Sequence, residues 1–138
     1  MNRRESRESV FTLLYETEFH PGEDVCEVYE RSCENREIKE NKYIKRAFFG
    51  VCDKKDELDA LITKHAVGWK TERMQKISRS ILRLAVYEML CMDDIPANVS
   101  INEAIELAKK FDDESARPFI NGVLNSVSKS LEKKDKDE

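Results

Sequence analysis

The sequence predicts an all-α fold, in which two bundles of about three helices each pack as a single domain. Apolar residues recur at helical spacing in successive segments and alternate with charged faces. Hydrophobic residues make up 40% of the chain and charged residues 38%, as expected for amphipathic helices, while Gly 4 and Pro 3 leave little material for the turns of an all-β fold. The bundles are expected over about 1–66 and 67–132, followed by a disordered charged tail over 133–138.

Three helices are expected in the N-terminal bundle. The first covers residues 1–19, and the second runs from a cap at Asp24 to about Arg36. The third, Lys42–Lys64, is predicted to be the longest, because its apolar residues keep nearly a heptad spacing. Gly50 inside it indicates a close crossing with another helix.

The C-terminal bundle is expected to open with a short helical piece at Thr71–Lys76. Ser78 is then placed to cap a helix over Arg79–Cys91, whose wide apolar face indicates that other helices surround it. Trp69, at the break before this bundle, is expected to be a packing anchor, with a platform for a ligand as the alternative.

The last two helices have capping signals of their own. Ser100 and Glu103 form an S-x-x-E capping box at the start of a helix that ends near Phe111. Ser115 is the expected cap of the final helix, with Pro118 in its first turn, where a missing N–H costs nothing.

Composition limits the function. The formal charge of -4 argues against attraction of nucleic acid to the whole surface, so any RNA site must be a local patch. The N-terminus has no apolar signal region, and no stretch approaches the roughly 18 apolar residues of a membrane span, so a cytoplasmic protein is expected. Four cysteines lack C-x-x-C spacing and are expected to be reduced thiols, and neither a metal nor a cofactor is predicted.

Catalysis is not expected. The sequence has no Gly-rich phosphate loop, no G-x-S-x-G and no H-E-x-x-H. Asp112, Asp113 and Glu114 lie together, but three carboxylates without a partner base are typical of a solvated turn. Binding is therefore the predicted activity.

An arginine-rich start is the clearest candidate for a phosphate site. Arg3, Arg4 and Arg7 carry guanidinium groups that match phosphate oxygens and stay charged at any working pH. Because Glu5 and Glu8 alternate with them, the same residues also fit a solvated helix end with local ion pairs.

Four segments resemble the NusB family of bacterial transcription antitermination factors. IPANVSINEAIELAKKF (95–111), followed by FINGVLN (119–125), resembles the family's C-terminal signature. ILRLAVYEML (81–90) resembles the helix before it, and RRESRESVFTLLYE (3–16) the arginine-rich first helix. The resemblance implies a NusB-like domain that binds boxA-type single-stranded RNA with the small-subunit ribosomal protein NusE. It further implies entry into an RNA polymerase antitermination complex, on ribosomal RNA operons.

Further RNA-binding residues are expected beyond the first helix. Lys76, Arg79 and Arg83 can extend the cationic track along an exposed edge of the helix that follows Ser78. The resemblance places Phe119 near the RNA surface, where its ring would stack on a base; an aromatic residue at a helix start also fits the core.

Two neighbours of Phe119 have open interpretations. Asn121 either caps backbone groups or reads a base edge, and Gly122 is expected to permit close approach of another helix.

Partner contacts are implied at Tyr15 and Glu16, where the family's first helix meets NusE. Tyr15 also fits a half-buried position with its hydroxyl at the surface. The other partner-facing position is Ser78, where some relatives carry an acidic residue, so one interface hydrogen bond can differ here. Some family members form homodimers that hide the RNA surface, and the apolar stripes do not decide this point.

Two alternatives remain at this stage. The N-terminal domain of some RNA cytosine methyltransferases resembles the NusB fold, but the sequence contains no Rossmann-type cofactor segment. A helical protein–protein adaptor without RNA affinity is the second, and the acidic net charge favours it.

Overall fold

The computed structural model describes residues 1–69 and 74–137, and within these ranges all regular structure is helical. The helices are α1 (Arg3–Thr17), α2 (Val25–Asn35), α3 (Lys42–Asp53), α4 (Lys55–His65), α5 (Lys76–Cys91), α6 (Ala97–Phe111) and α7 (Ala116–Asp137). The all-α prediction is confirmed. Of these helices, none has the length and apolar character needed to cross a membrane.

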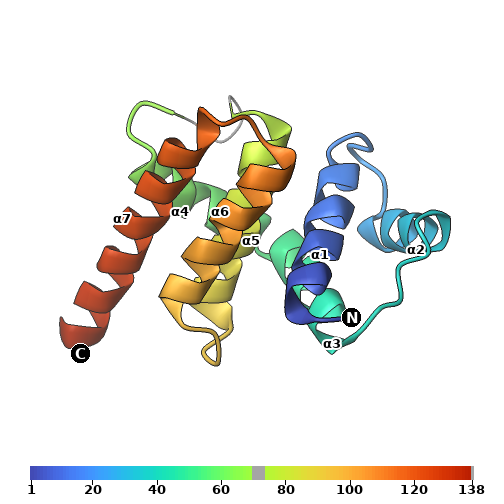
Figure 1. The fold of residues 1–138 in the computed structure, drawn as a ribbon, viewed down its shortest axis with the longest axis horizontal. Helices are drawn as coiled ribbons and strands as arrows, with labels where there is room; N and C mark the ends of the chain where they lie inside the picture. Colours follow the sequence, from blue (N-terminus) through green and yellow to red (C-terminus); the bar gives the residue numbers. More distant parts are fainter. Residues whose placement is uncertain (70–73, 138) are drawn as a thin grey trace.

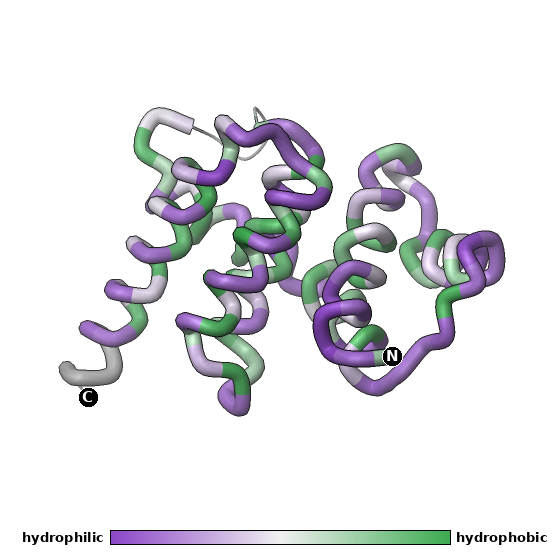
Figure 2. The backbone as a smooth tube through the Cα atoms, in the orientation of Figure 1, coloured by the Kyte–Doolittle hydropathy of each residue, from purple (hydrophilic) through white to green (hydrophobic). Residues whose placement is uncertain are grey.

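Two helix bundles lie side by side in the fold (Figure 1). In one, α1 packs against α2 and α3; in the other, α5, α6 and α7 pack against one another. The central helix is α5, which also contacts α1, α3 and α4, and its residues from Ser80 to Glu88 are all buried. Apolar and hydrophilic residues alternate along the helices (Figure 2), and the buried apolar residues form one core cluster.

A break at Lys54 divides the helix expected over Lys42–Lys64, so that prediction is wrong. The apolar stripe continues across the break, since Val51 and Leu58 are both buried. Asp56 and Glu57 occupy the first turn of α4, where carboxylates interact favourably with the helix dipole. The break lets α4 pack against α5 and α7 as well as α3.

Gly50 lies where α3 crosses α5, as predicted. A Cβ atom at this position would overlap the ring and hydroxyl of Tyr87 on α5. The absence of a side chain therefore sets how closely the two helices approach.

Helix caps agree with the sequence in the first bundle. The side chain of Asp24 accepts a hydrogen bond from the Cys26 amide at 2.7 Å, which confirms this cap. Asn2 and Asn41 cap α1 and α3 in the same way and were not predicted.

Ser78 does not cap a helix. The α5 helix begins at Lys76 after Gln75, so Ser78 lies inside its first turns and is buried. Its hydroxyl donates to Asp112 Oδ2 at 2.6 Å, across to the α6–α7 connection. Residues 71–73 of the short helical piece expected at Thr71–Lys76 lie outside the described residues, and Met74 and Gln75 precede α5 without helical structure.

The predicted capping box at Ser100 is also wrong. The α6 helix starts at Ala97, because Pro96 has the extended backbone of a helix cap, with φ -61 and ψ 145. Ser100 is consequently one turn inside the helix, buried, and its hydroxyl donates to Glu88 at 2.8 Å. Glu103 faces α1 instead of the serine amide.

The last helix begins as predicted, directly after Ser115, with Pro118 in its first turn. It continues past Leu131, the end of its apolar stripe, into the segment 133–138 that was expected to be a disordered tail.

Candidate nucleic-acid and partner interface

The three N-terminal arginines take different environments on α1. Arg3 and Arg4 are exposed, whereas Arg7 is buried at 5% exposure. The Arg3 guanidinium stacks over the ring of Tyr43, 4.4 Å from its centre. Only the first two therefore present cationic groups to solvent.

Buried Glu88 on α5 explains the inward position of Arg7. Arg7 Nε and Nη2 donate to its two carboxylate oxygens at 2.8 and 3.3 Å. Tyr43 and Ser100 donate their hydroxyls to the same carboxylate, so α1, α3, α5 and α6 meet at one charged group.

The charge states at this junction follow from the contacts. Burial alone lowers the pKa of Arg7, but the hydrogen bond and charge of Glu88 outweigh it, and the net pKa is raised. Burial, followed by the Glu88 charge, raises the pKa of Tyr43. Arg7 thus remains a cation and Tyr43 a neutral donor, and Arg7 holds α1 onto α5.

A second ion-pair network contains two of the expected RNA residues. Arg83 was predicted on an exposed edge, which is wrong: it is buried and forms paired hydrogen bonds to Asp59 at 2.7 and 2.8 Å. Arg79 and Arg83 both donate to Glu18, just past the end of α1. Burial raises the pKa of Glu18, but the Arg79 hydrogen bond and the Arg83 charge reverse this, and the net pKa is lowered.

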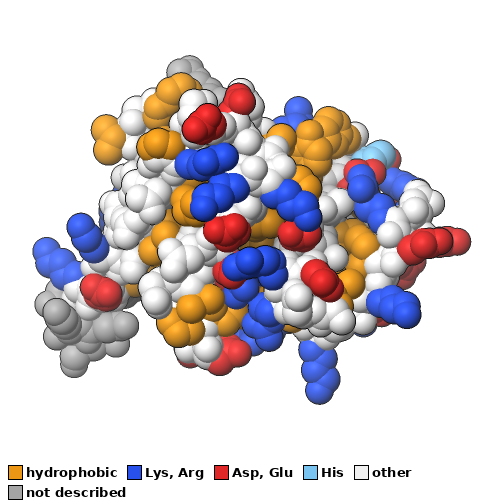
Figure 3. All heavy atoms as spheres, viewed as in Figure 1, with side chains coloured by type: hydrophobic (Ala, Val, Ile, Leu, Met, Phe, Trp, Pro, Cys, Tyr) orange, Lys and Arg blue, Asp and Glu red, His pale blue; other side chains and the backbone are white. Residues whose placement is uncertain are grey.

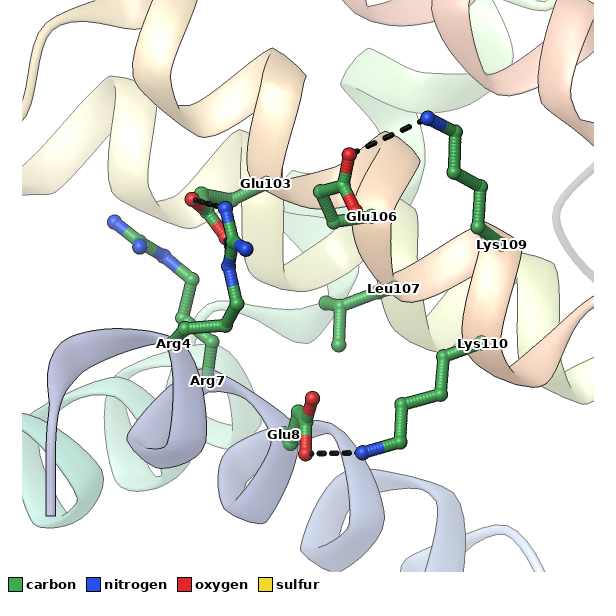
Figure 4. A pocket seen from close by; sticks show the side chains of 8 residues that line it. All are labelled: Arg4, Arg7, Glu8, Glu103, Glu106, Leu107, Lys109 and Lys110. Atoms are coloured by element: carbon green, nitrogen blue, oxygen red, sulfur yellow. Dashed lines mark hydrogen bonds and ion pairs between the residues drawn. The ribbon is translucent and has the colours of Figure 1, made fainter.

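Between α1 and α6 lies a groove of about 210 Å³ (Figure 4). Arg4 points into it from α1 and donates to Glu103 at 3.0 and 2.9 Å. Three ion pairs line it: Arg4–Glu103, Lys109–Glu106 and Lys110–Glu8. Lys109 and Lys110, in the last turn of α6, were not singled out from the sequence, although the polar face of the helix contained the signal.

These exposed pairs differ from the buried ones in strength. A solvent-exposed ion pair is worth about 0–1 kcal/mol, so a phosphate oxygen can replace the carboxylate at little cost. Acidic and basic side chains are interspersed over α1 and α6 in Figure 3. The groove is therefore lined by three cations whose carboxylate partners a phosphate can replace.

Aromatic side chains line a second cleft, of about 400 Å³, beyond the end of α6. Phe119 is partly buried against the core, and its ring meets Trp69 edge-on at 6.3 Å between centroids. Trp69 is 54% exposed, so it contacts Phe119 at the surface and is not the buried packing anchor that was expected. Ser78, Asp112 and Asp113 complete the polar side of the cleft.

Asn121 and Gly122 lie on the exposed side of α7. Asn125 donates to the Asn121 backbone oxygen at 2.8 Å and to its side-chain oxygen at 3.0 Å. A Cβ on Gly122 would meet nothing within 4 Å, so the predicted close helix approach there is wrong.

The residues expected to face a partner occupy the end of α1 and the start of α5. Tyr15 is partly buried between Phe11 and Phe19, with centroid distances of 6.0 and 5.0 Å. Phe19, missed in the sequence, is 52% exposed, and Lys76 lies over its ring at 5.4 Å.

Glu16 and Ser78 both have hydrogen-bond partners within the protein. Glu16 accepts a hydrogen bond from Arg36 at 3.2 Å, and the buried hydroxyl of Ser78 is used by Asp112.

Cysteine and metal chemistry contribute little. All four cysteines are free thiols, and burial raises the pKa of Cys52 to about 11, which keeps it protonated. In the described ranges no group of His, Cys, Asp or Glu is arranged to hold a metal ion. With exposed cations beside exposed rings, fold and surface define an all-helical binding protein.

Comparison with known proteins specifies this class further. The NusB family model matches residues 4–129. The transcription antitermination protein NusB of Ruminiclostridium cellulolyticum is 46% identical over 131 residues, covering 94% of this chain and 90% of that protein. NusB of T. maritima superposes with a TM-score of 0.82 at 34% identity, covering 94% of this chain and 92% of that one. This chain belongs to the NusB family, whose members are transcription antitermination factors rather than enzymes.

A solved complex of the antitermination factors NusB and NusE with double-stranded RNA is also similar in fold. Its matching chain has a TM-score of 0.82 and 28% identity, with 93% of this chain and 96% of that chain covered.

Proposed function

We propose that this protein binds boxA-type single-stranded RNA together with the ribosomal protein NusE and joins an RNA polymerase antitermination complex. Ribosomal RNA operons in the bacterial cytoplasm are its proposed place of action. The similar fold of a NusB in complex with NusE and RNA supports both partners.

One observation carries the RNA assignment: exposed cations line the groove between α1 and α6, and aromatic rings line the cleft beyond the end of α6. The groove between α1 and α6 begins at Arg4 and ends at Lys109 and Lys110, and the aromatic cleft opens beyond the end of α6. Cations that hold phosphates, followed by rings on which bases stack, are what single-stranded RNA requires.

Each element has a proposed role. Arg3, Arg4 and Lys110 contact phosphates, with Lys76 at the far edge. Phe119 stacks on a base, and Trp69 forms the opposite wall of its cleft. Asn121, exposed two residues after Phe119, is proposed to read a base edge.

Three of the sequence-predicted arginines have a different proposed role. Arg7, Arg79 and Arg83 are held by buried carboxylates, so they position α1 and α5 rather than touch RNA. Leaving a buried carboxylate to reach RNA would cost each of them several kcal/mol.

NusE is proposed to bind the exposed aromatic row at the end of α1. Tyr15 and Phe19 provide rings that are only partly covered, which is typical of anchor residues in interfaces. Glu16 flanks them, and Ser78 acts indirectly by fixing Asp112.

Fluorescence anisotropy tests the RNA assignment, with boxA-type RNA and a scrambled control, with and without NusE, at two salt concentrations. Selective binding that tightens with NusE and weakens with salt is expected. The Arg4→Ala/Lys110→Ala double variant and Phe119→Leu should each weaken it about 5–30-fold, since contacts of these kinds are worth about 1–2 kcal/mol. Lys55→Ala/Lys64→Ala on α4 is the charge-matched control. Equal or absent binding to both RNAs would leave a helical adaptor instead.

A further inference from the structure

A second cationic surface lies on α3, outside the groove. Lys42, Lys45 and Arg46 are separated by three and four residues and therefore share one side of the helix, and all three are exposed. Arg3 lies next to them, since Arg3, Lys42 and Arg46 line the same cleft of about 150 Å³. These four residues are called the α3 cationic face below.

The α3 cationic face differs from the groove in its charge balance. In the groove each cation is paired with a carboxylate, whereas among the described residues no carboxylate lies within 4 Å of the cationic groups of Arg3, Lys42 or Lys45. Arg46 donates to the backbone oxygen of Cys91 at the end of α5, which leaves its charge unneutralised. Asp94 is the acidic residue of the shared cleft.

The face is also held in place from inside. Tyr43 is fixed through its hydroxyl by buried Glu88, and the Arg3 guanidinium rests on the ring of Tyr43. Asn41 caps α3 through its side-chain oxygen and donates to Ser6 of α1 at 2.9 Å. The starts of α1 and α3 thus form one rigid unit, next to each other at the lower edge of Figure 1.

We propose that the α3 cationic face binds phosphates of the RNA that flanks the boxA-type element on one side. The inference rests on the proposed function and adds a site to it. Arg3 belongs both to this face and to the arginine-rich start of α1, so a strand leaving the groove at Arg4 passes directly onto α3. Because Lys42 and Arg46 span about 6 Å along the helix at 1.5 Å per residue, the contacts are to consecutive phosphates of one strand.

Phosphate recognition here is independent of base identity. The face offers ammonium and guanidinium groups, and its one ring, Tyr43, is buried and covered by Arg3. Contacts of this type add affinity and salt dependence without sequence preference. The flanking RNA is therefore recognised by length rather than by sequence.

The test compares three RNAs: the boxA-type core, the core extended by about six nucleotides on the 5′ side, and the core extended equally on the 3′ side. One extension should tighten binding to the unaltered protein, and replacing the added nucleotides with any other sequence should preserve the gain. In Lys42→Gln/Lys45→Gln this gain should disappear while affinity for the core is retained. In this variant the plot of log affinity against log salt should become less steep by up to about 1.4, which is about 0.7 for each of two lost phosphate contacts.

Controls separate this inference from the function on which it rests. Lys55→Gln/Lys64→Gln on α4 changes the net charge equally and should keep the gain; circular dichroism verifies that both double variants are folded. An extension gain that survives in Lys42→Gln/Lys45→Gln, or no gain with either extension in the unaltered protein, overturns the α3 site alone. If the unaltered protein fails to select the core over a scrambled RNA, both the proposed function and the α3 site are overturned. Loss of NusE binding instead of RNA binding in the α3 variant marks a protein-docking face and also overturns the inference.

Discussion

Arg4 and Arg7 lie one turn apart on α1, and both form two hydrogen bonds to a glutamate, yet they belong to different surfaces. Arg7 and Glu88 are almost fully buried, and Glu88 has two further donors. The side chain of Arg4 is 59% exposed and pairs with Glu103 over open groove. Burial of the carboxylate therefore separates an arginine that holds two helices together from one that is proposed to exchange its partner for a phosphate.

Glycines show the same contrast between interior and surface. Gly50 lies against Tyr87 at a helix crossing, while Gly122 faces open space on α7. Gly50 sets the distance between α3 and α5. Gly122 lowers the stability of α7 relative to alanine, and no neighbouring group requires a glycine there.

The largest effect is expected from Glu88→Ala. The substitution leaves Arg7 as a buried cation without a partner and removes the acceptor of Tyr43 and Ser100. The free energy of unfolding should fall by about 3–5 kcal/mol, measured by urea denaturation. Arg7→Met combined with Glu88→Leu should recover much of this loss, because no unpaired charge is left. A loss below about 1 kcal/mol in Glu88→Ala would remove the distinction between the two arginines.

A smaller loss is expected from Glu18→Gln, with a change in pH dependence. Because the pKa of Glu18 is lowered in the folded protein, its carboxylate contributes stability above the usual carboxyl pKa, and this contribution is lost as the pH falls through the lowered value. At neutral pH the variant should be about 1.5–3 kcal/mol less stable, since Arg79 and Arg83 lose a charged acceptor.

Urea titrations from pH 7 down to pH 3 measure this effect. The stability of Glu18→Gln should decline less steeply below pH 5 than that of the unaltered protein. Glu16→Gln, which removes a more exposed carboxylate from the last turn of α1, serves as the charge-matched control.

The pair of variants Gly50→Ala and Gly122→Ala tests whether a glycine at a helix crossing and a glycine at the surface respond differently to an added side chain. At Gly50 the new Cβ overlaps Tyr87, so a loss of about 1–3 kcal/mol in unfolding free energy is expected. At Gly122 there is room, and alanine should stabilise the helix by about 0.4–1 kcal/mol. Thermal and urea unfolding of both variants measure these changes. If both substitutions lowered, or both raised, the free energy of unfolding, this interpretation would be contradicted.

Helical periodicity predicted the fold well, because burial of an apolar stripe is encoded locally. The crossing at Gly50 and the cap at Asp24 were readable for the same reason. The break at Lys54 was not, because the apolar stripe runs through it unchanged. Ser100 was misread as a cap because an S-x-x-E pattern does not reveal that Glu88, distant in sequence, accepts its hydroxyl.

The candidate site was predicted less completely than the fold. An arginine-rich start identifies cations, but which of them faces inward depends on where a buried glutamate from another helix lies. Arg83 was misplaced in the same way, because Asp59 and Glu18 come from separate helical segments. Phe19 and Trp69 gave no periodic signal, and their exposure follows only from the packed structure.

The smallest effect on stability, and the sharpest test of the groove, is expected from Glu103→Gln. The side chain of Arg4 is 59% exposed, so the free energy of unfolding should change by less than about 1 kcal/mol when its partner is neutralised. RNA affinity should rise about 2–5-fold at low salt, because Arg4 is released and a negative charge leaves the groove. Glu57→Gln, which removes an exposed carboxylate paired with Lys54 on another part of the surface, should leave affinity unchanged. A fall in affinity in Glu103→Gln would mean that Glu103 orients Arg4 for RNA as Glu88 orients Arg7 for packing, and exposure alone would then not separate the two arginines.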